Sequence, residues 1–135
     1  MATWDDVRRI VGALPEVEEV RAHQWRVRKK LVVTERPLRK ADFEALGEAA
    51  PPDPILAVPV PDEFAKKALI ASDPDIYFTT PHFDGYPMVL IQLENIEADE
   101  LEELIVDSWL IRAPKRLARS YLDSRPSVSE GQPPT

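Results

Sequence analysis

The stretch QWRVRKKLVV, residues 24–33, alternates polar and apolar side chains and then ends in an apolar run. In an extended chain, Trp25 and Val27 point to one face, and the arginines that alternate with them point to the other. A period of two is typical of a half-buried strand, so we predict a β-hairpin that turns near Lys29. No Asn-Gly or Asp-Gly pair marks this turn, so the sequence leaves its register open.

Three apolar runs farther along the chain are interpreted as the remaining strands. They cover residues 55–60, 76–80 and 88–93. Pro59 has no backbone N–H to donate, which places the first run at a sheet edge or puts the proline near the end of its strand.

Helices are expected around and between these strands. Thr3 followed by Asp6 resembles a capping box that opens a helix ending at Gly12. Shorter helices are predicted at 39–47 and 61–72. The second is expected to carry Phe64, Ala68 and Leu69 on one face. A longer helix follows the i, i+3, i+4, i+8 spacing of an amphipathic helix through Leu101, Leu104, Ile105 and Trp109.

Helices that flank short strands predict an α+β fold, specifically a two-layer sandwich in which helices cover a mostly antiparallel sheet. A chain of 135 residues is expected to form one domain, here residues 1–123. Residues 124–135 contain three prolines and no aromatic side chain, so a disordered tail is expected there.

Composition restricts the functional class. No run approaches the length of apolar sequence that a transmembrane helix needs, so no membrane association is expected. The first ten residues, MATWDDVRRI, carry acids where a signal peptide needs a basic start, so we expect a cytoplasmic protein. The absence of cysteine excludes disulfides, thiol nucleophiles and thiolate metal sites.

Charge is distributed unevenly along the chain. The formal net charge is −7, which argues against nucleic-acid binding by the whole surface. Residues 21–40, however, hold eight bases and one acid, whereas residues 94–107 hold seven acids and no base. Local field, rather than net charge, then decides which partner approaches which face.

Signatures of common catalytic sites are missing. The four glycines are too scattered for a phosphate-binding loop, and the two histidines lack the spacing of a metal site. No G-x-S-x-G elbow is present. We therefore expect no cofactor, no metal and no recognisable catalytic constellation.

The stretch FTTPHFDGYP, residues 78–87, contains the densest group of reactive side chains. Asp84-Gly85 suits a tight turn, and the flanking prolines stiffen it, so we favour a rigid connection between two strands. The alternative is a small-ligand cleft, for which the candidate residues are Thr80, His82, Asp84 and Tyr86.

The stretches quoted above, together with ELIVDSWLIRAPKRLA near the carboxyl end, resemble the MmcQ/YjbR-like family of small bacterial proteins. The resemblance covers roughly residues 3–121. It implies a compact antiparallel α/β two-layer fold, similar to frataxin-like and secretion-chaperone-like arrangements. Members are commonly labelled DNA-binding, and no catalytic residues carry over from them. Where members often have a glycine in the hairpin turn, this chain has Lys29.

Three functions stay open at this stage. The first is binding of nucleic acid, without sequence preference, by a basic hairpin and loop within residues 21–40. Its candidate residues are Arg26, Arg28, Lys29, Lys30, Arg36, Arg39 and Lys40. The second is a protein-binding or adaptor role through a sheet edge or the polarised surface. The third is the small-ligand site at 78–87. The expected partner is thus DNA or another protein, and a monomer is favoured.

Overall fold

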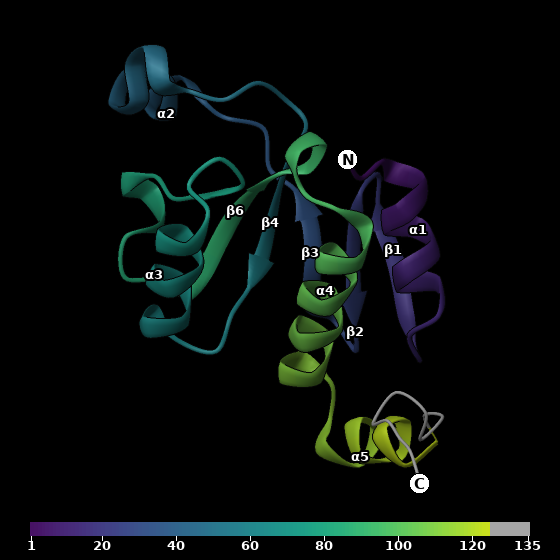
Figure 1. Ribbon diagram of the computed structural model, residues 1–135. Coiled ribbons are helices and arrows are strands. Elements are labelled where there is room, and N and C mark those ends of the chain that lie inside the picture. The colour runs from purple at the N-terminus through teal and green to yellow at the C-terminus, as the bar shows by residue number, and fades with distance from the viewer. Residues whose placement is uncertain (125–135) are drawn as a thin grey trace, which may run out of the picture.

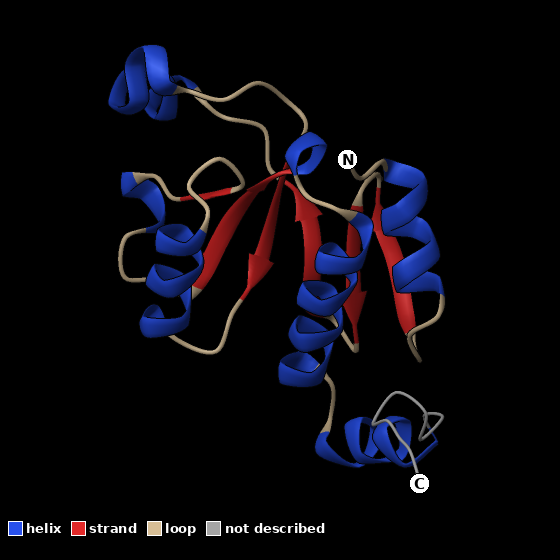
Figure 2. Ribbon diagram, viewed as in Figure 1, coloured by secondary structure: helices blue, strands red, loops and turns tan. Residues whose placement is uncertain are grey.

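The computed structural model describes residues 1–124 of the chain. Six strands form one sheet in the order β1-β2-β3-β4-β6-β5, and every described pairing is antiparallel (Figures 1 and 2). The strands are β1 (Val17–Arg21), β2 (Gln24–Val27), β3 (Lys30–Glu35), β4 (Ile55–Pro59), β5 (Tyr77–Phe78) and β6 (Met88–Gln92). The α-helices are α1 (Trp4–Gly12), α2 (Lys40–Leu46), α3 (Glu63–Ser72), α4 (Ala98–Arg112) and α5 (Lys115–Ser124). Short 3₁₀ helices are η1 (Gly47–Ala49), η2 (Pro81–Phe83) and η3 (Leu93–Asn95). The predicted α+β fold is confirmed.

The two faces of the sheet are covered to different extents. Helices α1, α3 and α4 lie on one face, where they enclose the larger core (Figure 1). Helix α2 and η2 cover only the β4–β6 part of the other face, where Ile55 and Ala57 contribute to a smaller core. Leu56 and Val58 alternate with them and enter the larger core, so β4 is buried on both faces. Among residues 1–124, no helix covers the far face of β1–β3.

Pro59 distinguishes the two alternatives offered by the sequence. β4 lies between β3 and β6, so it is a central strand and not an edge strand. Pro59 is the last residue of β4 and lies opposite Met88. The alternative that places the proline near the end of its strand is the correct one.

The β2–β3 hairpin turns where the alternation predicted it. Arg28 and Lys29 form the turn, both with positive φ, 49° and 74°. The alternation breaks inside β3, because a register shift puts Val32 and Val33 together into the larger core. A second hairpin, β1–β2, was not predicted, since four of the five residues of β1 are exposed and show no alternation.

The predicted amphipathic helix corresponds to α4. Ile105 and Trp109 are fully buried, and the Trp109 indole Nε1–H donates to the carbonyl of Pro15 at 3.0 Å. On the same helix, the Ser108 hydroxyl donates to the carbonyl of Val32 at 2.7 Å. These bonds fix α4 to β3 and to the exit of α1, whose predicted capping box is present.

Of the three apolar residues predicted to share a face of α3, Leu69 packs on the larger core, whereas Phe64 and Ala68 do not. Phe64 is 82% exposed and Ala68 is also exposed, whereas Lys66 is buried. The helix packs on the larger core through Ala65, Leu69 and Ile70, and Lys66 reaches polar groups inside the protein. The predicted tail lies outside the described residues, except for Ser124, which is the last residue of α5.

Candidate functional site

The stretch 78–87 connects β5 to β6 and is held from below by a buried lysine. The Lys66 ammonium donates to the carbonyl oxygens of Phe83 and Tyr86, at 2.6 Å and 3.0 Å. It also lies 3.4 Å from a carboxylate oxygen of Glu63. Gly85 adopts a φ of 82°, the left-handed conformation that glycine permits. Each of these carbonyls also accepts a backbone N–H, that of Tyr86 or of Met88, so the lysine adds a second, charged donor to each.

A second polar cluster joins the loop before α2 to the same connection. Arg36 is 9% exposed, and its guanidinium lies 3.2 Å from the Asp42 carboxylate and over the ring of Phe83. Burial by itself would raise the pKa of Asp42. The hydrogen bond from the Arg39 backbone N–H and the charge of Arg36 outweigh it, so the pKa is lowered. Asp42 is thus ionised and fixes the start of α2.

The four small-ligand candidates are divided between the interior and the surface. Thr80 is buried beside Asp42, whereas His82, Asp84 and Tyr86 are exposed. The His82 ring stands edge-on to Phe83, with 4.9 Å between ring centroids. The Thr80 hydroxyl is enclosed without a hydrogen-bond partner among residues 1–124, and the three exposed candidates lie on the connection between β5 and β6.

Three of the seven basic candidates are not available on the proposed nucleic-acid surface, because they are buried, ion-paired or directed to the other face of the sheet. Arg36 is buried with Asp42 as described above. The exposed Arg28 is ion-paired with Glu16. Lys30 lies opposite Val27 in the register, which directs its side chain to the helix-covered face of the sheet.

The other four basic candidates lie in two groups. Arg26 and Lys29 belong to the hairpin turn, where the Arg26 guanidinium donates to the carbonyl of Lys29 at 2.8 Å. Arg39 and Lys40 are at the start of α2, at the opposite end of β3. The length of β3 separates the two groups by about 17 Å. The seven residues therefore do not form one continuous cluster.

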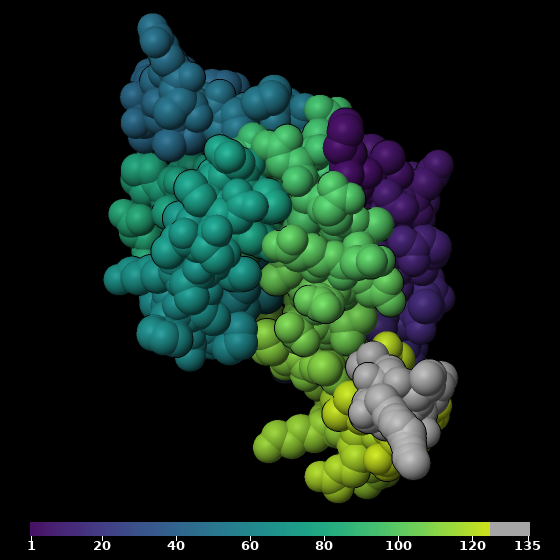
Figure 3. Space-filling model, viewed as in Figure 1, coloured from purple at the N-terminus to yellow at the C-terminus, as the bar shows by residue number. Residues whose placement is uncertain are grey.

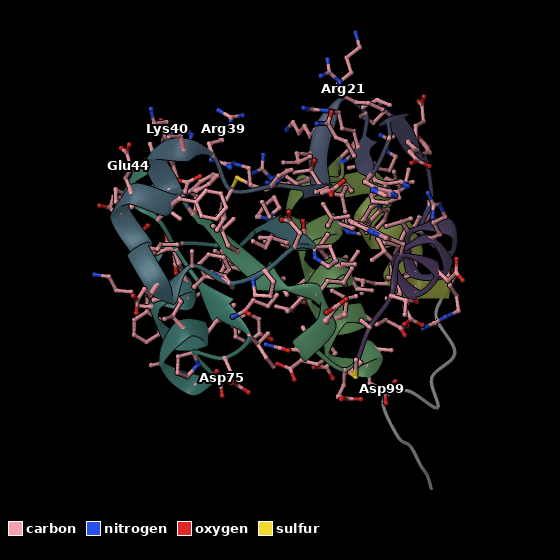
Figure 4. All side chains as sticks on the ribbon, turned by 90° about the horizontal axis from the view of Figure 1, so that it is seen from above. Arg21, Arg39, Lys40, Glu44, Asp75 and Asp99 are labelled. Carbon is pink, nitrogen blue, oxygen red and sulfur yellow. The ribbon has the colours of Figure 1, made fainter. Side chains whose placement is uncertain are left out.

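Arg21 joins the second group, although the sequence analysis did not select it from the basic run. Figure 4 shows Arg21, Arg39 and Lys40 along one edge of the molecule, with Asp75 and Asp99 along the opposite edge. Among residues 1–124, no ion pair engages any of these three cations. Arg21 lies at the end of the exposed strand β1, where the sequence shows no alternation that would indicate which way its side chain points.

The acidic helix α4 does not neutralise this basic edge. Within the described part of the chain, Glu102 pairs with Arg9 of α1, and Glu97 pairs with the amino terminus. Both partners lie outside the basic run at 21–40. The predicted polarisation of the surface is therefore preserved in the fold.

An aromatic stack around His23 was not expected from the sequence. The His23 ring lies parallel to that of Trp4, with 3.7 Å between centroids, and its Nδ1 is 2.9 Å from a carboxylate oxygen of Glu35. His23 itself has a positive φ of 59° in the β1–β2 turn. The stack joins α1 to the β1–β2 turn, so we interpret it as structural.

Comparison with known proteins gives the family. A family model described as YjbR matches residues 12–111. The chain belongs to the YjbR family. The resemblance drawn from the sequence is confirmed.

Similar YjbR-type chains occur in mycobacteria. They include the uncharacterized protein Mb2600 of Mycobacterium bovis and the uncharacterized proteins MT2646 and Rv2570 of Mycobacterium tuberculosis. Each is 57% identical to this chain over 125 residues, which cover 90% of this chain and 97% of the relative. No solved structure gave a significant match.

Neither a membrane-spanning helix nor a metal-binding group is found in the described part of this YjbR chain. No helix within residues 1–124 combines the length and apolar character needed to cross a bilayer. Over the same residues, no group of three or more His, Cys, Asp or Glu side chains is arranged to hold a metal ion.

Proposed function

We propose that the protein binds the phosphate backbone of nucleic acid, without reading sequence, on the side of the sheet left open by the helices. The observation that carries the proposal is in Figure 4, where Arg21, Arg39 and Lys40 lie on the edge opposite Asp75 and Asp99, although Glu44 lies beside Lys40. The proposed contacts come from Arg21, Arg26, Lys29, Arg39 and Lys40.

The register places two of these cations, Arg21 and Arg26, on the open face of the sheet. Trp25 and Val27 enter the larger core, so Arg26 between them points to the open face. Arg21 lies opposite Gln24 and points the same way. Long cationic side chains on a flat face can each meet a phosphate, which positions the nucleic acid but does not specify its sequence.

The acids on this side limit the strength of binding. Glu18 lies directly opposite Arg26 in the register, and Glu44 follows Lys40 by one helical turn. With a net charge of −7, the protein as a whole repels a polyanion, so attraction acts only within about 10 Å at 0.1 M salt. We expect binding in the micromolar range that weakens steeply with salt.

The test is fluorescence anisotropy of labelled duplex and single-stranded DNA, titrated at several salt concentrations. Five phosphate contacts give a log–log slope of about −4 to −5 on duplex. The double variant Arg39→Gln/Lys40→Gln weakens binding and reduces the slope by about 2. The charge-matched control Lys67→Gln/Arg119→Gln leaves both unchanged.

Removal of a negative charge near the proposed contacts gives a complementary test. Glu18→Gln removes the acid opposite Arg26 and tightens binding, whereas Glu102→Gln on α4 does not. The proposal is wrong if no binding occurs at about 50 mM salt and tens of micromolar protein. It is equally wrong if both double variants lose affinity alike.

A further inference from the structure

A groove with an apolar floor runs between α3 and α4, on the side of the molecule opposite the basic edge. Helix α3 lines it with positions one turn apart, including Ala65, Ala68 and Leu69, and helix α4 lines it with Leu104 and Ile111. The groove has a volume of about 390 Å³. Figure 3 shows it as the seam between α3 (teal) and α4 (green). Each helix thus presents an apolar stripe that the other leaves partly uncovered.

Exposed apolar side chains mark this groove as unfilled. Ile111 is 43% exposed at one end, and Leu69 and Leu104 are only half-buried although they face into it. Phe64, which is 82% exposed, precedes Ala68 by one helical turn on α3. Apolar surface gathered in one place, rather than scattered singly, is typical of an interaction site.

The groove continues into an acidic hollow along the first half of α4. The hollow shares Leu69, Leu104 and Asp107 with the apolar groove and adds Glu100 and Glu103. Over residues 1–124, no ion pair engages these three carboxylates. The site therefore combines an apolar floor with an unneutralised acidic rim.

The negative charge of the rim affects the pKa of Tyr77. The Tyr77 hydroxyl donates to the Glu100 carboxylate. Burial, the Glu100 bond and the negative charges of Asp73 and Glu103 together raise the pKa of Tyr77. A cation in this hollow would be attracted by the same negative charges.

We propose that this groove docks a cationic amphipathic helix of another protein. Apolar side chains at i, i+3, i+4 and i+7 of such a helix would fill the floor between α3 and α4. Lysines or arginines flanking that stripe would pair with Glu100, Glu103 and Asp107. Charge complementarity selects this occupant over an acidic or neutral segment.

A suitable probe is a fluorescein-labelled peptide of about 15 residues, made only of leucine and lysine with the leucines in one helical stripe. A scrambled peptide of the same composition, without the stripe, serves as its control. We expect the striped peptide to bind the full-length protein at least fivefold more tightly than the scrambled one. Equal binding would show attraction by charge alone and would overturn the proposal.

Substitutions on the groove separate insertion from simple attraction. Ile111→Ser removes an exposed apolar contact and is expected to weaken binding about fivefold. Ala68→Glu adds a negative charge and also narrows the floor of the groove. It is expected to weaken binding of a peptide helix that inserts into the groove, but to strengthen binding of a peptide that is attracted only by charge. Val20→Ser, an equally exposed apolar residue on β1, is the matched control and leaves binding within twofold. Tighter binding by Ala68→Glu would overturn the proposal.

Two other occupants of the groove have distinct signatures. Sedimentation that shows a dimer, abolished by Ile111→Ser, would assign the groove to a second copy of the chain. Shortening the chain to residue 124 would strengthen peptide binding tenfold or more if the carboxyl-terminal residues filled the groove themselves. Either result would overturn docking of another protein, whereas a monomer that binds equally well after shortening supports it.

Discussion

The clearest perturbation of this fold is Lys66→Met. The side chain of Lys66 is 3% exposed, and its ammonium joins α3 to the β5–β6 connection through the carbonyls of Phe83 and Tyr86. Methionine has a similar length and shape, so the replacement removes the charge and the donors and leaves little cavity. The adjacent Lys67 is exposed on the same helix, which makes Lys67→Met a matched control.

The expected cost follows from these contacts. A hydrogen bond to a charged group contributes about 1.5–3 kcal/mol, so two carbonyl bonds give roughly 3–6 kcal/mol. Desolvation of the buried ammonium cancels a part of that gain. After the change, the carbonyls of Phe83 and Tyr86 each keep one backbone donor, which limits the loss. We expect Lys66→Met to lower the free energy of unfolding by about 2–3 kcal/mol, and Lys67→Met to change it by less than about 0.5 kcal/mol.

Urea denaturation followed by tryptophan fluorescence measures both variants. Hydrogen exchange then locates the change, since Lys66→Met is expected to speed exchange of backbone amides in residues 80–88 and to leave α1 as it was. Equal stability of the two variants would refute the role assigned to Lys66. Lower stability without faster exchange in the connection would show that the lysine supports the fold in another way.

Two further predictions concern the turn and the polar cluster. Lys29 has a φ of 74°, so Lys29→Gly is expected to stabilise the protein by about 0.5–1 kcal/mol relative to Lys29→Gln, which removes the same charge. Urea midpoints of the two variants give the comparison, and a glycine variant no more stable than the glutamine variant would contradict it. The folded-state pKa of Asp42 lies below its ordinary value of 3.8. The ionised carboxylate therefore contributes its full stabilisation above pH 3.8, and this stabilisation is lost as the pH falls through the folded-state pKa. Urea unfolding between about pH 5 and 2 should therefore show a smaller acid-induced loss for Asp42→Asn than for the unmodified chain, and equal losses would argue against the ion pair with Arg36.

Elements whose signal is local were predictable. The capping box of Thr3 and Asp6 lies within one helical turn, and the spacing of Ile105 and Trp109 marks the buried face of α4 directly. The hairpin at Lys29 was also found, because alternation identifies a strand before its partner is known. The register shift that buries both Val32 and Val33 has no such signal.

Long-range polar contacts were not predictable. Nothing in the sequence indicated that Lys66 is buried, because lysine is almost never fully buried and its acceptors lie 17 and 20 residues away. Arg36 was assigned to a nucleic-acid surface because it lies in the basic run at 21–40, although the fold buries it against Asp42. Ion pairs and the strand register therefore remove part of the predicted basic candidates from the nucleic-acid surface.

The sequence by itself determined the fold class, most of the helices and strands, and the family, because these depend on periodicity, caps and the order of motifs along the chain. It also showed that positive and negative charge are concentrated in different segments. Only the tertiary structure decided which cations stay unpaired and which apolar helix faces stay uncovered. Those properties depend on how strands and helices distant in sequence pack against one another, and burial and ion pairing are consequences of that packing.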